Sequence, residues 1–592
     1  MPPMNKISEK PKSFTKSIGK LLSYSKKFLP VIIFSIFLAI ASSVLSVLGP
    51  NKLSDLSNEI MYNMYTGINF GNIFNIVLIL IIIYGLSAIF NATQGLMMAS
   101  ASQKISKNLR QDINRKILFL PFSYIDSTPY GNIMNRSAND VDTISHSLNH
   151  SFSNFLSSIT LILACIIMMF TTNWIMAFTA IVSSLLGFFI MALIISKSQK
   201  HFISQQKTLG EINGHIEEAF SAHDIIKVYN AGSSKKKQFD KINNKLYQSS
   251  WKSQFFSGIM PLLMHFIGNF SYVAVCVVGA VLTANNLISI GTIVAFIMYA
   301  RLFSNPLNQI AQSMSQLQSC AAASERVFDL LDQKEIEPDL NVKKINTRKI
   351  KGDVEFKNVS FGYTPDKTII KNFSASVKRG QKVAIVGPTG AGKTTLVNLL
   401  MRFYELDSGD ITIDGVSIKN IDRNDIHNIF GMVLQDTWLF EGTVRENLVY
   451  NQKDISDKQL DKICKVCGLS HFISTLPDGY DTILNDNTAV SVGQKQLMTI
   501  ARAMIQNCNL LILDEATSSI DTRTELLIQN AMDKLTEKRT SFVIAHRLST
   551  IKNADLILVM RDGNIVEQGT HKDLLKQNGF YAELYNSQFE EK

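Results

Sequence analysis

Six apolar segments in the first half of this chain limit its fold more than any other feature. Each contains about 18 or more mainly apolar residues, the length that an α-helix needs to cross the hydrocarbon core of a bilayer. The basic side chains within them are His265 in the fifth segment and Arg301 in the sixth. The sequence therefore predicts six membrane-spanning helices. The segments are residues 28–48, 74–97, 152–171, 174–195, 256–282 and 288–307.

The lysines and arginines of this half are concentrated in every second connection. They precede the first apolar segment and fill the connections from the second to the third and from the fourth to the fifth, whereas the other connections contain a single base, Lys52. Connections rich in Lys and Arg stay on the cytoplasmic side. We therefore expect a multi-pass protein of the plasma membrane with both termini in the cytoplasm. The net charge of +10 is mostly this asymmetry, so no nucleic-acid partner is indicated.

The two long basic connections, each about 50 residues, carry apolar residues at helical spacing. We expect the membrane helices to continue through them into the cytoplasm. Within the spans, Arg301 is expected to extend its guanidinium to the cytoplasmic interface. For His265, a functional role and a helix-to-helix hydrogen bond are equally open.

A glycine-rich loop lies between an apolar strand and a helical segment in the second half of the chain. Residues 383–386 are Val-Ala-Ile-Val, and the loop after them has the G-x-x-x-x-G-K-[ST] spacing of a phosphate-binding loop. Backbone N–H groups and a helix N-terminus attract phosphate oxygens, Lys393 supplies a point charge, and the Thr394 hydroxyl is a candidate Mg²⁺ ligand. The sequence thus predicts a magnesium-nucleotide site. The loop residues are Gly387, Pro388, Thr389, Gly390, Ala391, Gly392, Lys393, Thr394 and Thr395.

A second apolar strand ends in two acidic residues. Residues 510–513, Leu-Leu-Ile-Leu, precede Asp514 and Glu515. Open α/β sheets bind ligands at the carboxyl ends of their strands, so Asp514 is a candidate Mg²⁺ contact. Glu515 is then placed to orient and deprotonate an attacking water. Together with the glycine-rich loop, this pair predicts nucleotide hydrolysis.

These motifs, in this order, resemble those of the ATP-binding cassette (ABC) transporters. Residues from about 354 onward resemble an ABC ATPase domain, and residues up to about 331 resemble the six-helix membrane domain of the exporter branch. The resemblance implies an α-helical transmembrane bundle with long cytoplasmic extensions, followed by an α/β P-loop ATPase domain. The expected parts are a cytoplasmic leader at 1–27, the membrane domain with two coupling loops at 28–331, a linker at 332–352 and the ATPase domain at 353–592.

The resemblance also assigns roles to single residues. It places Tyr363 against the adenine, Gln435 on Mg²⁺, and Asp521 in the loop that crosses to the partner's ATPase domain. His546 matches the histidine that contacts the γ-phosphate, so His546 and Glu515 are the expected catalytic residues. The chemistry agrees, because an aromatic ring offers a face to a purine and an imidazole donates a hydrogen bond to developing phosphate charge.

The motif that caps the γ-phosphate of the partner's ATP departs from the family pattern. The family has Leu-Ser-Gly-Gly-Gln, whereas this chain has Val490, Ser491, Val492, Gly493 and Gln494. Val492 puts a β-branched residue, which disfavours positive φ, where the family has glycine. We expect backbone strain and a weakened contribution to the partner's ATP site. The chain then resembles the catalytically intact subunit of heterodimeric multidrug-type exporters, and a homodimer with two weakened sites is the alternative.

The resemblance implies ATP-driven export of hydrophobic or amphipathic compounds by alternating access. ATP and Mg²⁺ are the expected ligands, and the expected partners are a second ABC half-transporter, the lipid bilayer and the transported compound. Short helices near 128–135 and 222–227 are expected to dock into ATPase domains. The alternatives are a homodimeric lipid or drug flippase and a nucleotide-gated channel or regulator. Retention of Glu515 and His546 disfavours the channel.

Overall fold

The chain folds into two compact units. The computed structural model describes residues 13–65, 67–337, 350–435, 437–485, 490–514, 521–545 and 547–589. Within these residues, the first unit comprises the chain up to Leu120 together with Thr128–Lys334. The second unit comprises Pro121–Ser127 and the chain from Glu335 onward. Each unit has its own architecture.

The first unit contains six helical segments that are long and apolar enough to span a membrane, which confirms the predicted bundle. Helix α3 has 50 residues and α10 has 53, so each is about 75–80 Å long at 1.5 Å per residue. That is more than twice the thickness of the hydrocarbon core, about 30 Å. The third segment, Tyr130–Thr172, also includes α5, α6 and the π-helical turns η2 and η3. The bounds are α2 (Leu29–Tyr62), α3 (Phe70–Phe119), α5 (Tyr130–Asn135), η2 (Arg136–Asp140), α6 (Val141–His146), η3 (Ser147–Ser151), α7 (Phe152–Thr172), α8 (Trp174–Ser221), α10 (Gly232–Ala284) and α11 (Ile290–Leu331).

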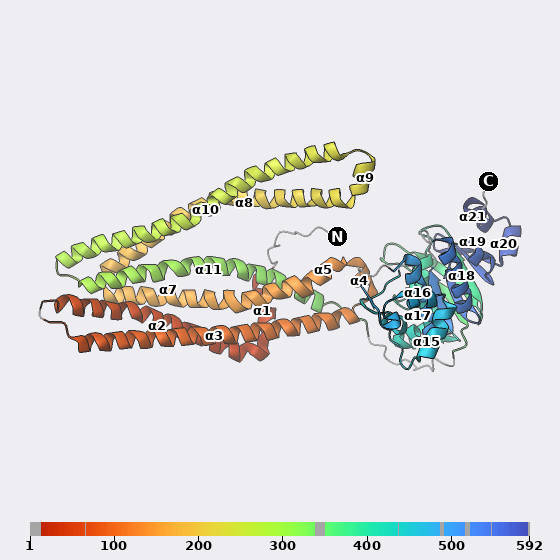
Figure 1. The fold of residues 1–592 in the computed structure, drawn as a ribbon, viewed down its shortest axis with the longest axis horizontal. Helices are drawn as coiled ribbons and strands as arrows, with labels where there is room; N and C mark the ends of the chain where they lie inside the picture. The colour runs from red at the N-terminus through yellow and green to blue at the C-terminus, as the bar shows by residue number, and fades with distance from the viewer. Residues whose placement is uncertain are drawn as a thin grey trace. The chain divides into compact units, whose positions relative to one another are not determined.

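The long helices pack in pairs. Figure 1 shows α8 and α10 lying side by side and diverging from α7 and α11 toward the short helix α9 (His223–Val228). Polar side chains join α7 and the preceding turn η3 to α11, because Ser158 Oγ of α7 donates to Gln309 Oε1 at 3.0 Å and Ser151 of η3 donates to Gln316. Serines let neighbouring helices approach closely and hydrogen-bond within a membrane, where no water replaces these bonds.

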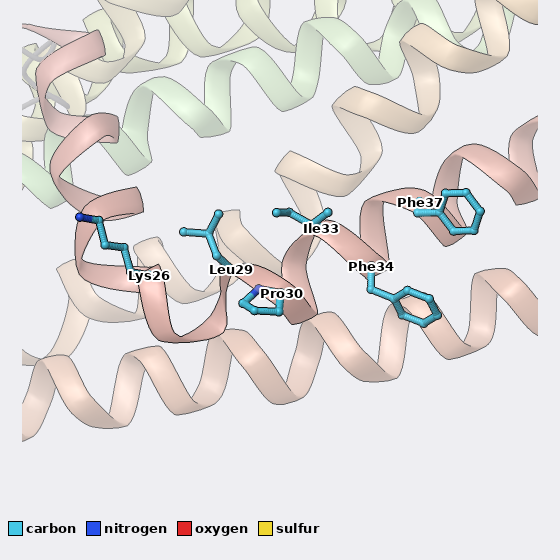
Figure 2. Close-up of a pocket in the computed structure, with 6 residues that line it drawn as sticks. All are labelled: Lys26, Leu29, Pro30, Ile33, Phe34 and Phe37. Carbon is cyan, nitrogen blue, oxygen red and sulfur yellow. The ribbon is translucent and has the colours of Figure 1, made fainter.

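A change from basic to apolar side chains accompanies the beginning of α2, the helix of the first candidate span. Helix α1 (Phe14–Tyr24) packs on α11 through buried Leu21. Figure 2 shows the next part of the chain, where Lys26 is followed by an apolar groove that continues to Phe37 on α2. A change from lysines to exposed apolar side chains is typical of the edge of a membrane span. The groove residues are Lys26, Leu29, Pro30, Ile33, Phe34 and Phe37.

The second unit is built on a six-stranded sheet with the strand order β12-β11-β3-β10-β9-β6. All neighbours in it are parallel except β11 and β12. A second, antiparallel sheet has the order β2-β1-β4-β5. The parallel strands therefore present their carboxyl ends at one edge. The strands are β1 (Val354–Phe361), β2 (Ile370–Val377), β3 (Lys382–Val386), β4 (Ser408–Ile413), β5 (Val416–Ser417), β6 (Phe430–Val433), β9 (Leu510–Asp514), β10 (Thr540–Ile544), β11 (Leu556–Arg561) and β12 (Asn564–Gly569).

Two hydrophobic cores support the second unit. One packs β1, β2 and β4 against the main sheet and α12 (Lys393–Leu400), with Phe356, Phe373 and Phe542 in edge contacts. The other surrounds α17 (Val492–Gln506) and α18 (Thr522–Thr536). The remaining elements are α13 (Arg423–Ile429), β7 (Gly442–Thr443), α14 (Val444–Val449), α15 (Asp457–Val466), α16 (Ser470–Thr475), β8 (Ile483–Leu484), α19 (Leu548–Lys552), α20 (His571–Lys576) and α21 (Phe580–Phe589).

A short piece of the membrane half belongs to the second unit. Helix α4 (Phe122–Ser127) stacks the Phe122 ring on Phe403, with centroids 4.7 Å apart and an interplanar angle of 11°. Tyr404 Oη donates to Asp126, and burial together with this carboxylate raises the pKa of Tyr404. Residues 128–135, which we expected to dock into an ATPase domain, lie in the first unit, and their docking stays a prediction. Within the second unit, the neighbouring segment 121–127 packs on Phe403 through the Phe122 ring.

Arg326→Ala tests the main buried ion pair of the membrane unit. Arg326 on α11 binds Asp140 with both its Nε (2.9 Å) and its Nη2 (2.5 Å), and the Asp140 side chain is only 4% exposed. Removal of the arginine leaves a buried carboxylate unpaired, which costs about 3–5 kcal/mol. We expect a clear fall in the melting temperature of the detergent-solubilised protein. Lys52→Ala, which breaks an exposed pair with Asp55, should change it little; equal melting temperatures for the two variants would contradict this reading.

Candidate nucleotide-binding site

The glycine-rich loop has the backbone that a phosphate cradle needs. It follows β3 directly, and Gly390 (φ 84°) and Gly392 (φ 99°) adopt the left-handed conformations that side chains disfavour. A Cβ on Gly392 would lie 2.7 Å from Ile370 Cδ1. Helix α12 begins at the next residue, Lys393. The loop thus turns its backbone toward a helix N-terminus, where N–H groups attract an anion.

Lys393 closes the loop on itself. Its Nζ donates to the carbonyl oxygens of Gly387 (2.8 Å) and Pro388 (3.0 Å). Burial lowers the pKa of Lys393, and the negative charge of Asp514 opposes that fall. The structure therefore brings together the lysine of the loop and the first acid of the second motif.

The sheet explains why distant motifs meet. Asp514 ends β9 and pairs with Ile544 on β10, which in turn pairs with Ile385 on β3. Gln435 lies two residues beyond β6, at the same edge, and is exposed. Glu515 and His546 lie outside the described residues. In the sequence, Glu515 directly follows Asp514, the last residue of β9, and His546 is the second residue after the end of β10.

The side chains at this edge suit Mg²⁺ bound together with phosphate. Magnesium prefers oxygen ligands and is usually held by one or two carboxylates plus substrate phosphates. The described residues offer the exposed Thr394 hydroxyl, the Gln435 amide and the Asp514 carboxylate. Within the described ranges, no three His, Cys, Asp or Glu side chains form a metal cage. Such an edge fits an ion that arrives with its nucleotide.

Tyr363 forms an aromatic wall beside the loop. Its hydroxyl lies 3.2 Å from Thr395 Oγ1, which directly follows Thr394. Its ring meets those of Phe361 and Tyr404 edge-on, with centroids 5.1 and 5.0 Å away. Since the residue is still 46% exposed, one ring face is open to a purine. Tyr404, which sequence reasoning missed, is the second side of this wall; the aromatic pair 403–404 after α12 was its signal.

The motif at residues 490–494, which departs from the family pattern, begins α17 without backbone strain. Ser491 caps the helix, with Gln494 N donating to Ser491 Oγ (3.2 Å) and Ser491 N donating to Gln494 Oε1 (2.9 Å). Val492 is the first helical residue and is not in a left-handed conformation. The expectation of backbone strain at this residue was therefore wrong. Its side chain is 58% exposed and Gly493 is buried. The consequence of Val492 is therefore an apolar side chain at the helix start.

Asp521 caps α18 in the same way. Its carboxylate accepts from Thr524 N at 2.9 Å, and this backbone donor lowers the pKa of Asp521. Among the described residues, the hydrogen bonds of Ser491 and Asp521 are local and do not reach the glycine-rich loop. The loop, Asp514 and Tyr363 are thus one group, and Ser491 and Asp521 lie outside it.

Comparison with known proteins decides the family. The ABC transporter transmembrane region matches residues 32–307, and the ABC transporter ATPase family matches residues 370–518. A fatty acid ABC transporter ATP-binding/permease protein of Mycobacterium tuberculosis is 40% identical over 90% of this chain and 85% of its own length. An uncharacterized ABC transporter ATP-binding protein of Bacillus subtilis is 37% identical over 98% and 96% of the two chains, and an ATP-dependent lipid A-core flippase of Syntrophus aciditrophicus is 31% identical over 87% and 85%.

The chain is an ABC transporter. Because its membrane region and its ATPase domain are fused, it is a half-transporter of the exporter type, as the motifs predicted. ATP hydrolysis is coupled to transport in this transporter, and its ATPase domain is cytoplasmic.

Lys393→Ala tests the loop. The charged ammonium supplies charge-assisted hydrogen bonds to the β- and γ-phosphates, so its loss should weaken ATP binding at least about tenfold in a fluorescent-nucleotide titration. Lys382→Ala is the matched control, because Lys382 lies at the opposite end of β3 and pairs with Asp533 (3.2 Å). Equal affinities for the two variants would remove Lys393 from the site.

Proposed function

We propose that this transporter exports hydrophobic or amphipathic compounds of the multidrug type by alternating access, as one half of a heterodimer. In this proposal both termini lie in the cytoplasm. The carrying observation is the nucleotide edge at Lys393 and Asp514, combined with a helix, α17, that begins with Val492. Two ATPs held between two ATPase domains close them, and closure turns the membrane cavity outward.

The residues divide the work at the phosphates. Tyr363 stacks on the adenine, and the residues 387–395 hold the phosphates through backbone N–H groups and Lys393. Thr394, Gln435 and Asp514 hold Mg²⁺, which neutralises charge on the phosphates when bound. Glu515 orients and deprotonates the water, and His546 donates to the γ-phosphate. Ser491, Gly493, Gln494 and Asp521 serve the ATP site of the partner.

The pairing proposal depends on which ATP site Val492 affects. The motif at residues 490–494 acts on the partner's ATP. An apolar side chain at the start of its helix therefore disturbs the partner's site and leaves this chain's own site intact. A heterodimer with one hydrolytic and one degenerate site accommodates this asymmetry. Because the backbone of Val492 is unstrained, this motif can still contribute to an ATP site, which supports the homodimeric alternative with two weakened sites.

The relatives narrow the cargo toward lipid-like molecules. One is named for fatty acids and another for the lipid A core. Both names fit an amphipathic cargo, and neither describes a hydrophilic one. Lipid or lipid-like drugs are accordingly the compounds that we propose for this transporter.

Glu515→Gln tests the catalytic role. The amide keeps the shape of the carboxylate but takes no proton from water, so ATP turnover should fall by about 100-fold or more, while ATP-driven closure is retained. Phosphate release measures turnover, and a distance probe between the two ATPase domains measures closure. Turnover at the unmutated rate would contradict the assignment.

Val492→Gly separates the two pairings. In a heterodimer, this motif serves a degenerate site, so the glycine should leave the ATPase rate of the purified pair within about twofold, and the chain alone should hydrolyse little ATP. In a homodimer, the same change should raise the rate of the chain alone. The rate of the chain by itself, before and after the change, is therefore decisive.

A further inference from the structure

The exposed face of α11 changes character halfway along the helix. In its inner half, this face carries Arg301, Asn305, Gln312 and Ser315, all exposed. At 100° per residue they fall within a sector of about 80°. In the outer half, the same sector carries apolar side chains, namely Ile290, Val294 and Ile297. One face thus joins a polar half to an apolar half, with Arg301 at the junction.

Hydrogen bonds between the spans give the depth of Arg301. At the outer end of α7, Thr172 Oγ1 donates to Asn51 Oδ1 of α2 at 3.3 Å. Seven residues deeper, Cys165 Sγ donates to the carbonyl oxygen of Tyr299 on α11 at 3.5 Å. Arg301 follows Tyr299 by two residues, so its Cα lies about 13 Å below the Thr172 level at 1.5 Å per residue. In a core about 30 Å thick, that is close to the middle of the bilayer.

This depth changes the expectation for Arg301. The cytoplasmic interface is about 17 Å away, which is farther than an arginine side chain reaches, so Arg301 does not extend its charge there. Its guanidinium has no ion pair or hydrogen bond among the described residues. An unpaired cation facing hydrocarbon is costly, so this face lines a water-filled space or meets an anion.

The neighbouring amides favour a ligand over a lipid-facing surface. Asn305 and Gln312 are exposed, and no described group hydrogen-bonds to their side chains. By contrast, Gln309 and Gln316, which flank this sector, bind serines of α7. Free amides beside a free guanidinium offer several donors to one anionic group.

We propose that Arg301 binds the anionic headgroup of an amphipathic substrate and that the apolar outer half of the same face holds its tail. This inference rests on the proposed export function and adds the sign of the substrate's charge. A carboxylate or phosphate matches the planar, bidentate donors of arginine. The six spans contain no Asp or Glu, so they offer no counter-charge for a cationic drug.

Native mass spectrometry of the purified full-length assembly tests the inference without requiring hydrolysis. The probes are oleate and oleyl alcohol, which share a chain and differ in charge. The unmutated protein should bind oleate more tightly. Arg301→Ala should raise the dissociation constant of oleate at least tenfold and leave that of oleyl alcohol unchanged. Arg301→Lys should give a dissociation constant between those of the unmutated protein and Arg301→Ala, because lysine retains the charge but loses the bidentate geometry.

Lys252→Ala is the matched control, since it removes an exposed cation from the cytoplasmic part of α10 and should leave oleate binding unchanged. Equal binding of the two probes, or unaltered oleate binding by Arg301→Ala, overturns the proposal. Dissociation of the assembly by Arg301→Ala also overturns it, because Arg301 then holds the subunit interface. Because oleate binding is measured without ATP hydrolysis, its outcome is independent of the ATP-binding test with Lys393→Ala and the turnover test with Glu515→Gln. A failure of this inference can therefore be distinguished from a failure of the proposed function.

Discussion

The nucleotide site depends on the parallel alignment of β3, β10, β9 and β6. Their backbone ladders place Ile385, Ile544 and Asp514 at one level, so residues more than a hundred positions apart meet at one edge. The ladder bonds are buried and leave no other register that keeps these apolar strands between helices. Once they are set, Lys393 and Asp514 are close enough for their charges to interact. The aromatic wall and the oxygen donors are then arranged around that pair.

In the membrane half, the bilayer imposes the corresponding constraint. Backbone groups have no water to bind there, so the chain crosses as continuous helices, and polar side chains must find partners between them. Ser151 of η3 and Ser158 of α7 bind glutamines on α11, and Asp140 binds Arg326. Arg301 differs from them, because it is exposed and has no hydrogen-bond or ion-pair partner among the described residues. That contrast separates side chains that hold the helices together from one that is open to a ligand.

Much of this could be predicted from the sequence, because span length and the glycine-rich motif depend on local chemistry. Hydropathy found the six segments but not the helix ends; α2 continues past Pro50 to Tyr62, since a helix outside the membrane needs no apolar run. Arg301 was expected near the cytoplasmic interface because the inner half of α11 is polar, which makes the span look as if it ends early; the position that we propose for it is deeper. Val492 was expected to be strained, since the sequence does not reveal that α17 starts at that residue. The place of residues 121–127 in the second unit could not be predicted, because the Phe122–Phe403 contact joins residues that only the fold brings together.

Tyr404 has a double attachment within the ATPase unit. Its ring abuts Tyr363, the proposed seat of the base, and its phenol holds Asp126 of α4. A purine that stacks on Tyr363 and tilts its ring would therefore push on Tyr404. Tyr404 is in turn hydrogen-bonded to Asp126, in a segment that comes from the membrane half of the sequence. Two side chains, Tyr363 and Tyr404, thus connect the proposed position of the base to Asp126 without involving the phosphates.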